Sequence, residues 1–303
     1  MSEASNVSDF NESIQHDFIE DLKRSVSGGI PTSSYIVGEV IKTIYDESSN
    51  AADLAEIIER DPPLTAKILK VANSAYYGAT KRITSLQRAV VVLGFGTIKE
   101  LVTTIAIVHS FFHQDSKSGI DRTGLWLHSV GTAKASQLIA AKTGTARSDI
   151  GYTIGLLHDI GKIVLALSFP KLYANVLDYS IQKDIKIIEA ERKVLNIDHC
   201  MIGSILCSIW DLPEELSNPI LYHHSPGAID ESGCNLCKIV HIGDQMCRKA
   251  GIGNPGDHFK PDPDREALSV FGESNQEKVL KYQAIYREFI EEKEDIEAFF
   301  KGL

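Results

Sequence analysis

Residues 155–162 place an imidazole and a carboxylate, His158 and Asp159, inside an otherwise apolar run that also holds Lys162. Burying such groups is costly unless they are paired or coordinated. Neighbours on a helix differ by about 100° in direction, so His158 and Asp159 can lean into one crevice while Lys162 returns to the His158 face. The alternative is a helix whose polar residues are merely solvated, and the surrounding apolar residues disfavour it. The run predicts a buried metal site on a core helix.

The composition is that of a globular chain with an acidic surface. The 303 residues are 43% hydrophobic and 24% charged, enough for one large core or two domains. The formal charge of -10 argues against non-specific binding to nucleic acid or to an anionic membrane. The five cysteines, an odd number, suit a reducing compartment with free thiols.

Neither a signal peptide nor a membrane span is expected. The first thirteen residues are polar and acidic, without an apolar core. The most apolar stretch, Leu101–Phe112, is too short and too polar to cross a bilayer. We therefore expect a cytoplasmic protein.

Apolar residues recur at helical spacing throughout the chain, whereas strand-like alternation is nowhere sustained, so we expect an all-α fold. Asn50 with Asp53 is expected to open one helix, and Pro62 to begin the next, which should end at Gly78. Capping boxes are predicted at Thr84–Gln87 and Thr97–Glu100.

Later helix boundaries are also marked. A helix is expected from about 121 to 142 with His128 on its buried face, and Asp198 is expected to cap a helix at 199–210. A short helix after Pro213 should leave His223 and His224 at its end, and another should cover 235–250. In segment 185–195 the apolar residues follow no clear helical or strand spacing.

Turn-rich and charged segments suggest two helical lobes. The expected organisation is a disordered terminus at 1–13, an amino-terminal helical lobe at 14–113, a linker at 114–120, a second helical lobe with the metal-site candidate at 121–251, and a loop with a helical tail at 252–303. Phe299 and Phe300 are expected to anchor the tail.

Three segments of the amino-terminal lobe closely resemble the HDOD family. They are Asp61–Gly78, with the sequence DPPLTAKILKVANSAYYG, Ile83–Ala89 and Leu93–Ile98. The resemblance extends from about Gly29 to Ala250, and it implies an all-helical relative of the HD and HD-GYP phosphohydrolases. Asn73 and Ser74, near a turn, are expected to hydrogen-bond loop backbone.

Seven side chains are candidate metal ligands, spread over separate helices as a site in a bundle core requires. They are His128, His158, Asp159, His199, His223, His224 and Asp244. Any one of them alone is more often a satisfied core residue. In HD-type enzymes a His, an adjacent His-Asp pair and a later Asp hold one metal, which the resemblance places at His128, His158, Asp159 and Asp244.

HD-GYP enzymes add histidines for a second metal, and by residue type these match His199, His223 and His224. Lys162 matches the lysine that follows the His-Asp pair. The resemblance thus implies up to two divalent ions, with iron or manganese favoured, held by nitrogen and oxygen ligands. If the protein is an enzyme, Asp159 and Lys162 are its expected catalytic residues.

Two departures from the HD-GYP pattern argue against hydrolysis of a cyclic dinucleotide and against a third metal. Gly124 stands where some HD-GYP proteins carry a metal-binding carboxylate, and Ser225-Pro226-Gly227 replaces the Gly-Tyr-Pro signature. Cys234 and Cys237 have the spacing of half a zinc site or a redox motif, but they lack a second pair and are expected to be small buried residues. His241, three residues before Asp244, could orient that carboxylate, although a core or surface role is the simpler expectation.

The leading hypothesis is a signal-transduction module of the HDOD type that acts by protein interaction or ligand sensing. Its partners would be signalling proteins, and a nucleotide or phosphorylated small molecule is a further candidate. The first alternative is a metal-dependent phosphohydrolase, in which two ions would activate a water while Lys162 stabilises charge on the phosphate. The second alternative is a structural metal, which would hold the helices of the bundle together without catalysis. Regulation is expected to involve the amino-terminal lobe, because it carries family-specific residues but no catalytic set.

Overall fold

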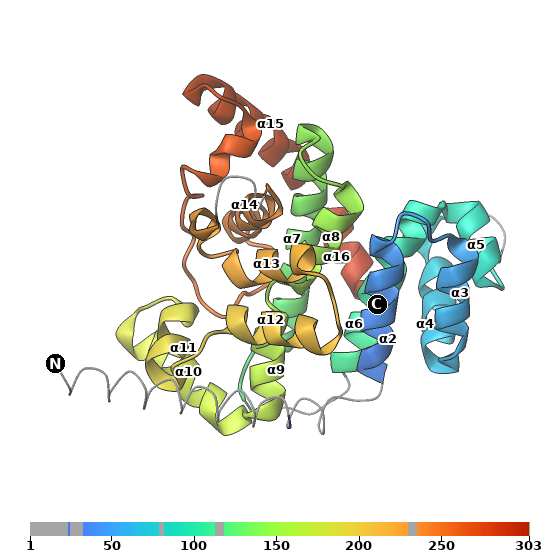
Figure 1. The fold of residues 1–303 in the computed structure, drawn as a ribbon, viewed down its shortest axis with the longest axis horizontal. Coiled ribbons are helices and arrows are strands. Elements are labelled where there is room, and N and C mark those ends of the chain that lie inside the picture. Colours follow the sequence, from blue (N-terminus) through green and yellow to red (C-terminus); the bar gives the residue numbers. More distant parts are fainter. Residues whose placement is uncertain (1–23, 25–32, 79–81, 113–117, 230–234, 303) are drawn as a thin grey trace.

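The structure, a computed structural model, describes Arg24 and residues 33–78, 82–112, 118–229 and 235–302, and it is all-α within these ranges, as predicted (Figure 1). The α-helices are α2 (Ser33–Tyr45), α3 (Ala51–Glu59), α4 (Pro62–Ala72), α5 (Leu86–Leu93), α6 (Phe95–Phe112), α7 (Arg122–Thr143), α8 (Ser148–Leu157), α9 (Ile160–Ser168), α10 (Pro170–Lys183), α11 (Ile187–Leu195), α12 (His199–Ile209), α13 (Glu214–Tyr222), α14 (Asn235–Ala250), α15 (Asn275–Glu291) and α16 (Lys293–Gly302). Three short 3-10 helices are η1 (Ala75–Tyr77), η2 (Pro226–Ala228) and η3 (Ala267–Phe271). The expected disorder at 1–13 lies outside the described residues.

Several helix starts follow the predicted capping chemistry. Asn50 and Asp53 form a capping box at α3, since the Asn50 side chain accepts from a backbone N–H and Asp53 accepts from Asn50 N at 2.8 Å. Pro62 occupies the first turn of α4, and the Asp61 side chain caps it. Asp198 caps α12. Short polar side chains thus satisfy backbone donors that a helix start leaves free.

Two predicted capping boxes are wrong. The cap of α5 is Ser85, one residue after Thr84, and its hydroxyl accepts from Arg88 N at 3.1 Å. Thr97 lies inside α6, which begins directly after Gly94. Gly94 has a φ of 86°, a conformation that glycine adopts without strain. The tight turn at Gly94 therefore ends one helix and starts the next without room for a side-chain cap.

Asn73 joins the end of α4 to the segment that precedes α5. Its side-chain amide donates to Leu69 O at 2.6 Å and to Ile83 O at 2.8 Å, and its Oδ1 accepts from Ile83 N at 2.7 Å. The role predicted for Asn73 is confirmed. The same role for Ser74 is wrong, because its hydroxyl is buried without a hydrogen-bond partner. The helix expected to continue to Gly78 instead ends at Ala72.

The centre of the molecule is built on close helix packing around α7, α8, α9, α12 and α14 (Figure 1). A Cβ atom on Gly155 would lie 2.7 Å from Cα of Ala133 in α7. A Cβ atom on Gly161 would overlap the carbonyl oxygen of His199, the first residue of α12. These glycines therefore set the distances at which α8 packs on α7 and α9 packs on α12.

The segment Ser148–Ser168 is long and apolar enough to cross a membrane, by length and composition only, and it is 94% buried inside the fold. It comprises α8 and α9, which form the core of the protein. Within the described chain, Ser148–Ser168 and not Leu101–Phe112 is therefore the segment whose length and composition most resemble a membrane-spanning helix.

The carboxy-terminal helix α16 packs on α7 and η1, so residues far apart in the sequence lie together. Phe299 is 4% exposed, and its ring centroid lies 5.3 Å from that of Tyr76 and 6.4 Å from that of Tyr77. Phe299 therefore anchors the tail, as predicted, and Phe300 is partly buried against the same core.

Candidate metal centre

His158 and Asp159 occupy a break between two helices. The sequence predicted one continuous helix here, but α8 ends at Leu157 and α9 begins at Ile160. Asp159 has φ -99° and ψ 10°, outside the helical well. The break turns both side chains towards α7, α12 and α14, where the other candidate ligands lie.

The four residues of the predicted HD set come together, all 0–1% exposed. Nε2 of His128 lies 2.9 Å from Oδ1 of Asp244 and 4.0 Å from Oδ2 of Asp159. Nε2 of His158 lies 3.4 Å from the same Asp159 oxygen. Ligands bound about 2.1 Å from one ion and at right angles to each other stand about 3 Å apart. The separations therefore suit a single divalent ion.

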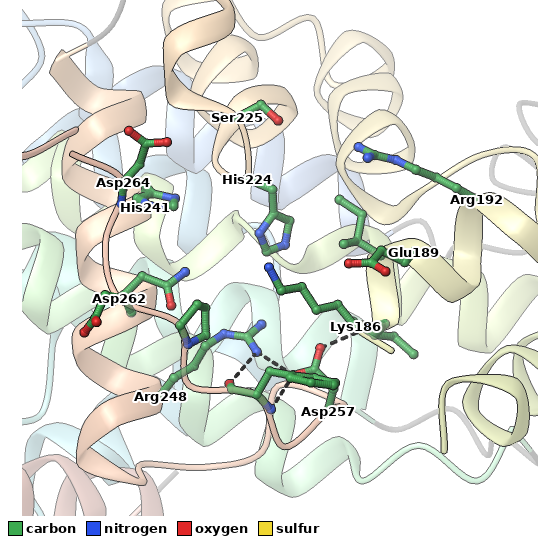
Figure 2. Close-up of a pocket in the computed structure, with 15 residues that line it drawn as sticks. Lys186, Glu189, Arg192, His224, Ser225, His241, Arg248, Asp257, Asp262 and Asp264 are labelled. Atoms are coloured by element: carbon green, nitrogen blue, oxygen red, sulfur yellow. Dashed lines mark hydrogen bonds and ion pairs between the residues drawn. The ribbon is translucent and has the colours of Figure 1, made fainter. Parts of the chain in front are cut away.

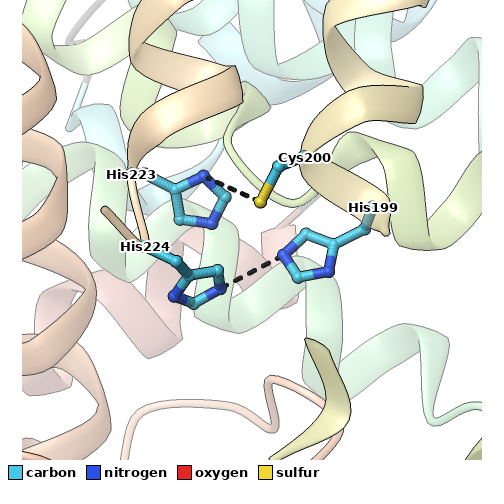
Figure 3. Close-up of side chains that lie close together, drawn as sticks. All are labelled: His199, Cys200, His223 and His224. Atoms are coloured by element: carbon cyan, nitrogen blue, oxygen red, sulfur yellow. Dashed lines mark hydrogen bonds between the residues drawn. The ribbon is translucent and has the colours of Figure 1, made fainter. Parts of the chain in front are cut away.

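The second predicted set lies on the other carboxylate oxygen of Asp159. Oδ1 of Asp159 is 3.3 Å from Nε2 of His199 and 3.8 Å from Nε2 of His223. Nε2 of His224 lies 3.2 Å from Nε2 of His199 (Figure 3). Asp159 thus stands between the two sets, with one oxygen directed at each.

Backbone carbonyls fix the orientation of two imidazoles. Nδ1 of His158 donates to Gly155 O at 2.7 Å, and Nδ1 of His223 donates to Ile220 O at 2.8 Å. Each Nε2 atom then carries the lone pair, which is the form that binds a metal. Burial lowers the pKa of His223 well below its ordinary value, and the nearby His158 and His199 add to this effect.

Glu191 fixes the orientation of the His199 imidazole, and nothing in the sequence pattern indicated this role. Its Oε2 accepts from His199 Nδ1 at 2.6 Å and from His199 N at 2.9 Å, while Oε1 accepts from Tyr173 OH at 2.9 Å. Glu191 is 0% exposed and lies in α11, within the segment 185–195 whose apolar residues follow no clear spacing. Glutamate is seldom fully buried unless it is paired, so only its burial, which the sequence does not show, could have indicated this role.

Three inward-facing atoms of this cluster are buried and have no hydrogen-bond partner: His158 Nε2, His223 Nε2 and Asp159 Oδ1. Such groups are costly unless something binds them. They are electron-pair donors, so another acceptor cannot satisfy them, whereas a cation can. The residues present therefore fit the divalent metal that the HD pattern implies.

Two buried cations offset the two carboxylates. Lys162 Nζ lies 2.7 Å from Asp159 Oδ2 and 2.9 Å from Pro255 O, and it is fully buried. Burial would raise the pKa of Asp159, but His158 and Lys162 outweigh it and hold that pKa well below its ordinary value. Arg248 Nε donates to Asp244 Oδ1 at 2.8 Å and lowers the pKa of Asp244 against the opposing effect of burial. Both carboxylates are therefore charged.

A loop after α14 completes the centre beyond the predicted residues. Pro255 supplies the carbonyl that holds Lys162, and Asp257 accepts from Arg248 Nη1 at 2.7 Å. The same loop passes close to α7, where Asn254 N donates to Gly124 O at 2.8 Å. A Cβ atom on Gly124 would lie 2.7 Å from Cβ of Asn254. The loop therefore occupies the space that a carboxylate side chain at position 124 would need.

His241 and the cysteines lie beside the ligand set. His241 orients His223 and not Asp244, because its Nδ1 donates to His223 O at 2.7 Å and its Nε2 accepts from Asp264 N at 3.0 Å. Cys200 lies among the histidines in Figure 3, but its Sγ is 3.8 Å from Nδ1 of His223, the nitrogen that faces away from the centre. Burial raises the pKa of Cys200 well above its ordinary value and keeps it a thiol.

The expectation of free thiols holds for Cys200, Cys207 and Cys247, which are free and buried. It is wrong for Cys237, which is disulfide-bonded. Cys234 lies outside the described residues.

A cavity of about 300 Å³ adjoins the centre at His224, which is half-buried (Figure 2). It lies between α11, α14 and the loop after α14. Its wall includes His224 and Gln245 at the centre, the cations Lys186, Arg192 and Arg248, and the carboxylates Glu189, Asp257, Asp262 and Asp264.

Comparisons with known proteins agree with this fold. A structure of an HDOD domain protein of unknown function from Geobacter sulfurreducens is 28% identical, with a TM-score of 0.73 over 91% of this chain and 97% of that one. A Marinobacter aquaeolei VT8 structure, named as a candidate signal transduction protein, is 24% identical, with a TM-score of 0.74 over 90% of this chain and 59% of that one. A Shewanella amazonensis structure, named as a candidate phosphohydrolase, is 22% identical, with a TM-score of 0.69 over 93% and 97% of the two chains. The last two show the fold alone.

Curated relatives match over part of their length. An uncharacterised protein of Treponema pallidum is 26% identical over 195 residues, which are 64% of this chain and 37% of that protein. The uncharacterised protein YuxH of Bacillus subtilis is 30% identical over 148 residues, or 46% of this chain and 34% of YuxH. The chain thus spans about a third of the length of these relatives. The HDOD domain description matches residues 30–226, most of the chain, and the protein therefore belongs to the HDOD domain family.

Proposed function

We propose that this protein is a cytoplasmic regulatory HDOD module whose HD-type centre binds one or two divalent metal ions and senses a ligand or a partner protein. His128, His158, Asp159 and Asp244 would hold one ion. His199, His223 and His224 would hold the second, with Asp159 shared between the two.

One observation carries this proposal. His158 Nε2, His223 Nε2 and Asp159 Oδ1 are buried and unpartnered, while carbonyl groups fix the other ring nitrogen of both histidines. A lone pair on a buried imidazole nitrogen destabilises the fold when nothing binds it. Hydrogen bonds that fix the other ring nitrogen are what metal-binding histidines receive from the residues around them.

A metal-dependent phosphohydrolase is the second candidate, and the cavity beside His224 favours it, because a small molecule there can reach the centre. Divalent ions at such a site polarise phosphoryl oxygens and make water a better nucleophile. Lys162 is bound to Asp159 and Pro255 O and is fully buried. It therefore supports the proposal by holding Asp159 in place, and contact with a phosphate would require it to leave that position.

The experiment that tests the regulatory proposal against catalysis compares the metal-loaded protein with a panel of phosphomonoesters and phosphodiesters. A protein that holds stoichiometric metal and hydrolyses none of them is the expected result for a sensor. Hydrolysis that is abolished in Asp159→Asn would establish the enzyme instead.

Partner contacts are proposed for the amino-terminal helices. Val91 and Val92 of α5 are 75% and 40% exposed, although the face of α5 that carries Leu86 and Ala89 is buried. Replacing Val91 with Ser should weaken partner binding and leave the metal content unchanged. A loss of metal in this variant would show that the lobe and the centre are one indivisible site.

A further inference from the structure

The wall of the cavity beside the centre carries both a cation and acceptor groups. Figure 2 shows the Lys186 ammonium directed towards His224, with Asp262 on another side of the cavity. Lys186 lies at the start of α11, and within the described chain its ammonium forms no hydrogen bond or ion pair. A cation held free beside a metal centre attracts an anion.

The other charged groups at this wall are largely paired. Arg248 bonds to Asp244 and Asp257, and Arg192 Nε lies 2.7 Å from Asp198. Lys186 is therefore the cation that remains available to an incoming anionic group, together with the proposed metal beside His224.

The same wall also offers acceptors. Gln245 lines the cavity, is 3% exposed, and donates its amide to Asp244 Oδ2 at 3.3 Å. This bond leaves the Gln245 carbonyl Oε1, which is buried and has no partner. A buried acceptor without a donor is costly, and the Asp262 carboxylate adds a second acceptor on the same wall. Donors on a ligand would satisfy both.

We propose that this cavity binds a small phosphate monoester whose organic part carries hydroxyl or amino donors. The phosphate would contact Lys186 and the metal centre, and the donors would face Gln245 and Asp262. The volume of about 300 Å³ is at the small end for ligand pockets. It suits a sugar phosphate, a phosphorylated amino alcohol or a mononucleotide, and it is too small for a cyclic dinucleotide.

This inference rests on the proposed metal centre, and the test separates the two. Metal-loaded protein is titrated calorimetrically with methyl phosphate, glucose 6-phosphate, phosphoethanolamine, adenosine 5′-monophosphate and a cyclic dinucleotide. Methyl phosphate carries the same phosphate group but no hydroxyl or amino donors. The difference in affinity between it and the other monoesters therefore measures what the donors contribute. At least one donor-bearing monoester should bind about tenfold more tightly than methyl phosphate, and the best of the three identifies the class.

Two variants and a matched control make the assignment specific. Gln245→Met keeps the side-chain length and should reduce the best ligand to the affinity of methyl phosphate. Lys186→Met should weaken all the monoesters about equally. Lys193→Met removes an exposed lysine of the same helix that does not line the cavity, and it should change nothing.

Lys186→Met should retain the wild-type metal content, and the Gln245 variant is titrated after saturation with metal, because Gln245 also bonds to Asp244. The inference is overturned if methyl phosphate or the cyclic dinucleotide binds as tightly as the best monoester, or if the Gln245 and Lys186 variants behave like the Lys193 control. It is also overturned if metal-loaded protein binds no monoester, in which case the metal centre itself stands. Protein that takes up no metal would instead contradict the proposed function.

Discussion

Nδ1 of His199 lies 2.6 Å from Oε2 of Glu191, deep inside the protein, and the same oxygen accepts the His199 backbone N–H at 2.9 Å. The carboxylate fixes both the ring and the start of α12. It also increases the electron density on the opposite nitrogen, which faces Asp159. If His199 binds a metal as proposed, Glu191 would influence the strength of that bond without being a ligand itself.

Replacing Glu191 with Gln should lower metal affinity by about 10–100-fold, because the amide cannot fix the tautomer as a carboxylate does. Competition with a chelator measures this change, and circular dichroism checks that the helices persist. Glu189→Gln, two residues earlier and exposed, should keep wild-type affinity. Equal affinities in the two variants would show that the second ion does not depend on His199.

Replacing Asp159 with Asn should remove most of the metal affinity while preserving the helical fold, because Asp159 has one oxygen directed at each ligand set. In metal-free protein the change also leaves the Lys162 ammonium buried without its counter-charge, which should cost about 3–5 kcal/mol of unfolding free energy. Urea denaturation without metal measures this cost.

Combining Asp159→Asn with Lys162→Met separates the two roles of Asp159. The double variant should regain much of the stability, because no buried charge is left unpaired, but it should not regain metal binding. If Asp159→Asn costs stability and leaves metal affinity intact, Asp159 is only the partner of Lys162.

Metal-free protein should lose stability as the pH falls below about 6.5, the ordinary pKa of histidine. Burial lowers the pKa of His128 and of His223 in the folded chain, so the unfolded chain takes up protons first. Each such imidazole should cost about 1.4 kcal/mol per pH unit between its unfolded and folded pKa. Urea denaturation at pH 7.5 and 5.5 with the metal chelated measures the loss, and His223→Asn should make it smaller. Unchanged stability over this interval would mean that these imidazoles are not held neutral.

Replacing Asn73 with Ala should destabilise the protein by about 2–3 kcal/mol, since it removes three hydrogen bonds worth about 1 kcal/mol each. Its metal content should not change. Ser74→Ala is the matched control, because the Ser74 hydroxyl is buried without a partner and its loss should be neutral or stabilising. Thermal unfolding of both variants checks the prediction, which fails if the two lose the same stability.

Local chemistry made much of the fold predictable. The Asn50–Asp53 box, Pro62 and Asp198 mark helix starts through bonds that span only three residues. The all-α class and the helical placement of His128 and Asp244 followed from periodicity. The grouping of these distant residues did not follow from any local signal, and it came from the resemblance to HD proteins.

What the sequence did not reveal depends on contacts between distant segments. The chain breaks between α8 and α9 at His158–Asp159, although the apolar residues on both sides of the break follow the pattern of one continuous helix. Glu191 looks like an ordinary surface glutamate until the fold brings it against His199 at the start of α12. The cap at Ser85 differs from the predicted Thr84 by one residue, because both side chains can accept the same kind of bond.

Elemental analysis of protein purified without added metal is the direct test of the proposed metal centre. We expect one to two first-row divalent ions per chain, iron or manganese foremost, with most of the metal lost in His158→Ala and Asp159→Asn and retained in Ser74→Ala. Protein that holds no stoichiometric metal and takes none up from a series of first-row ions would contradict the metal centre.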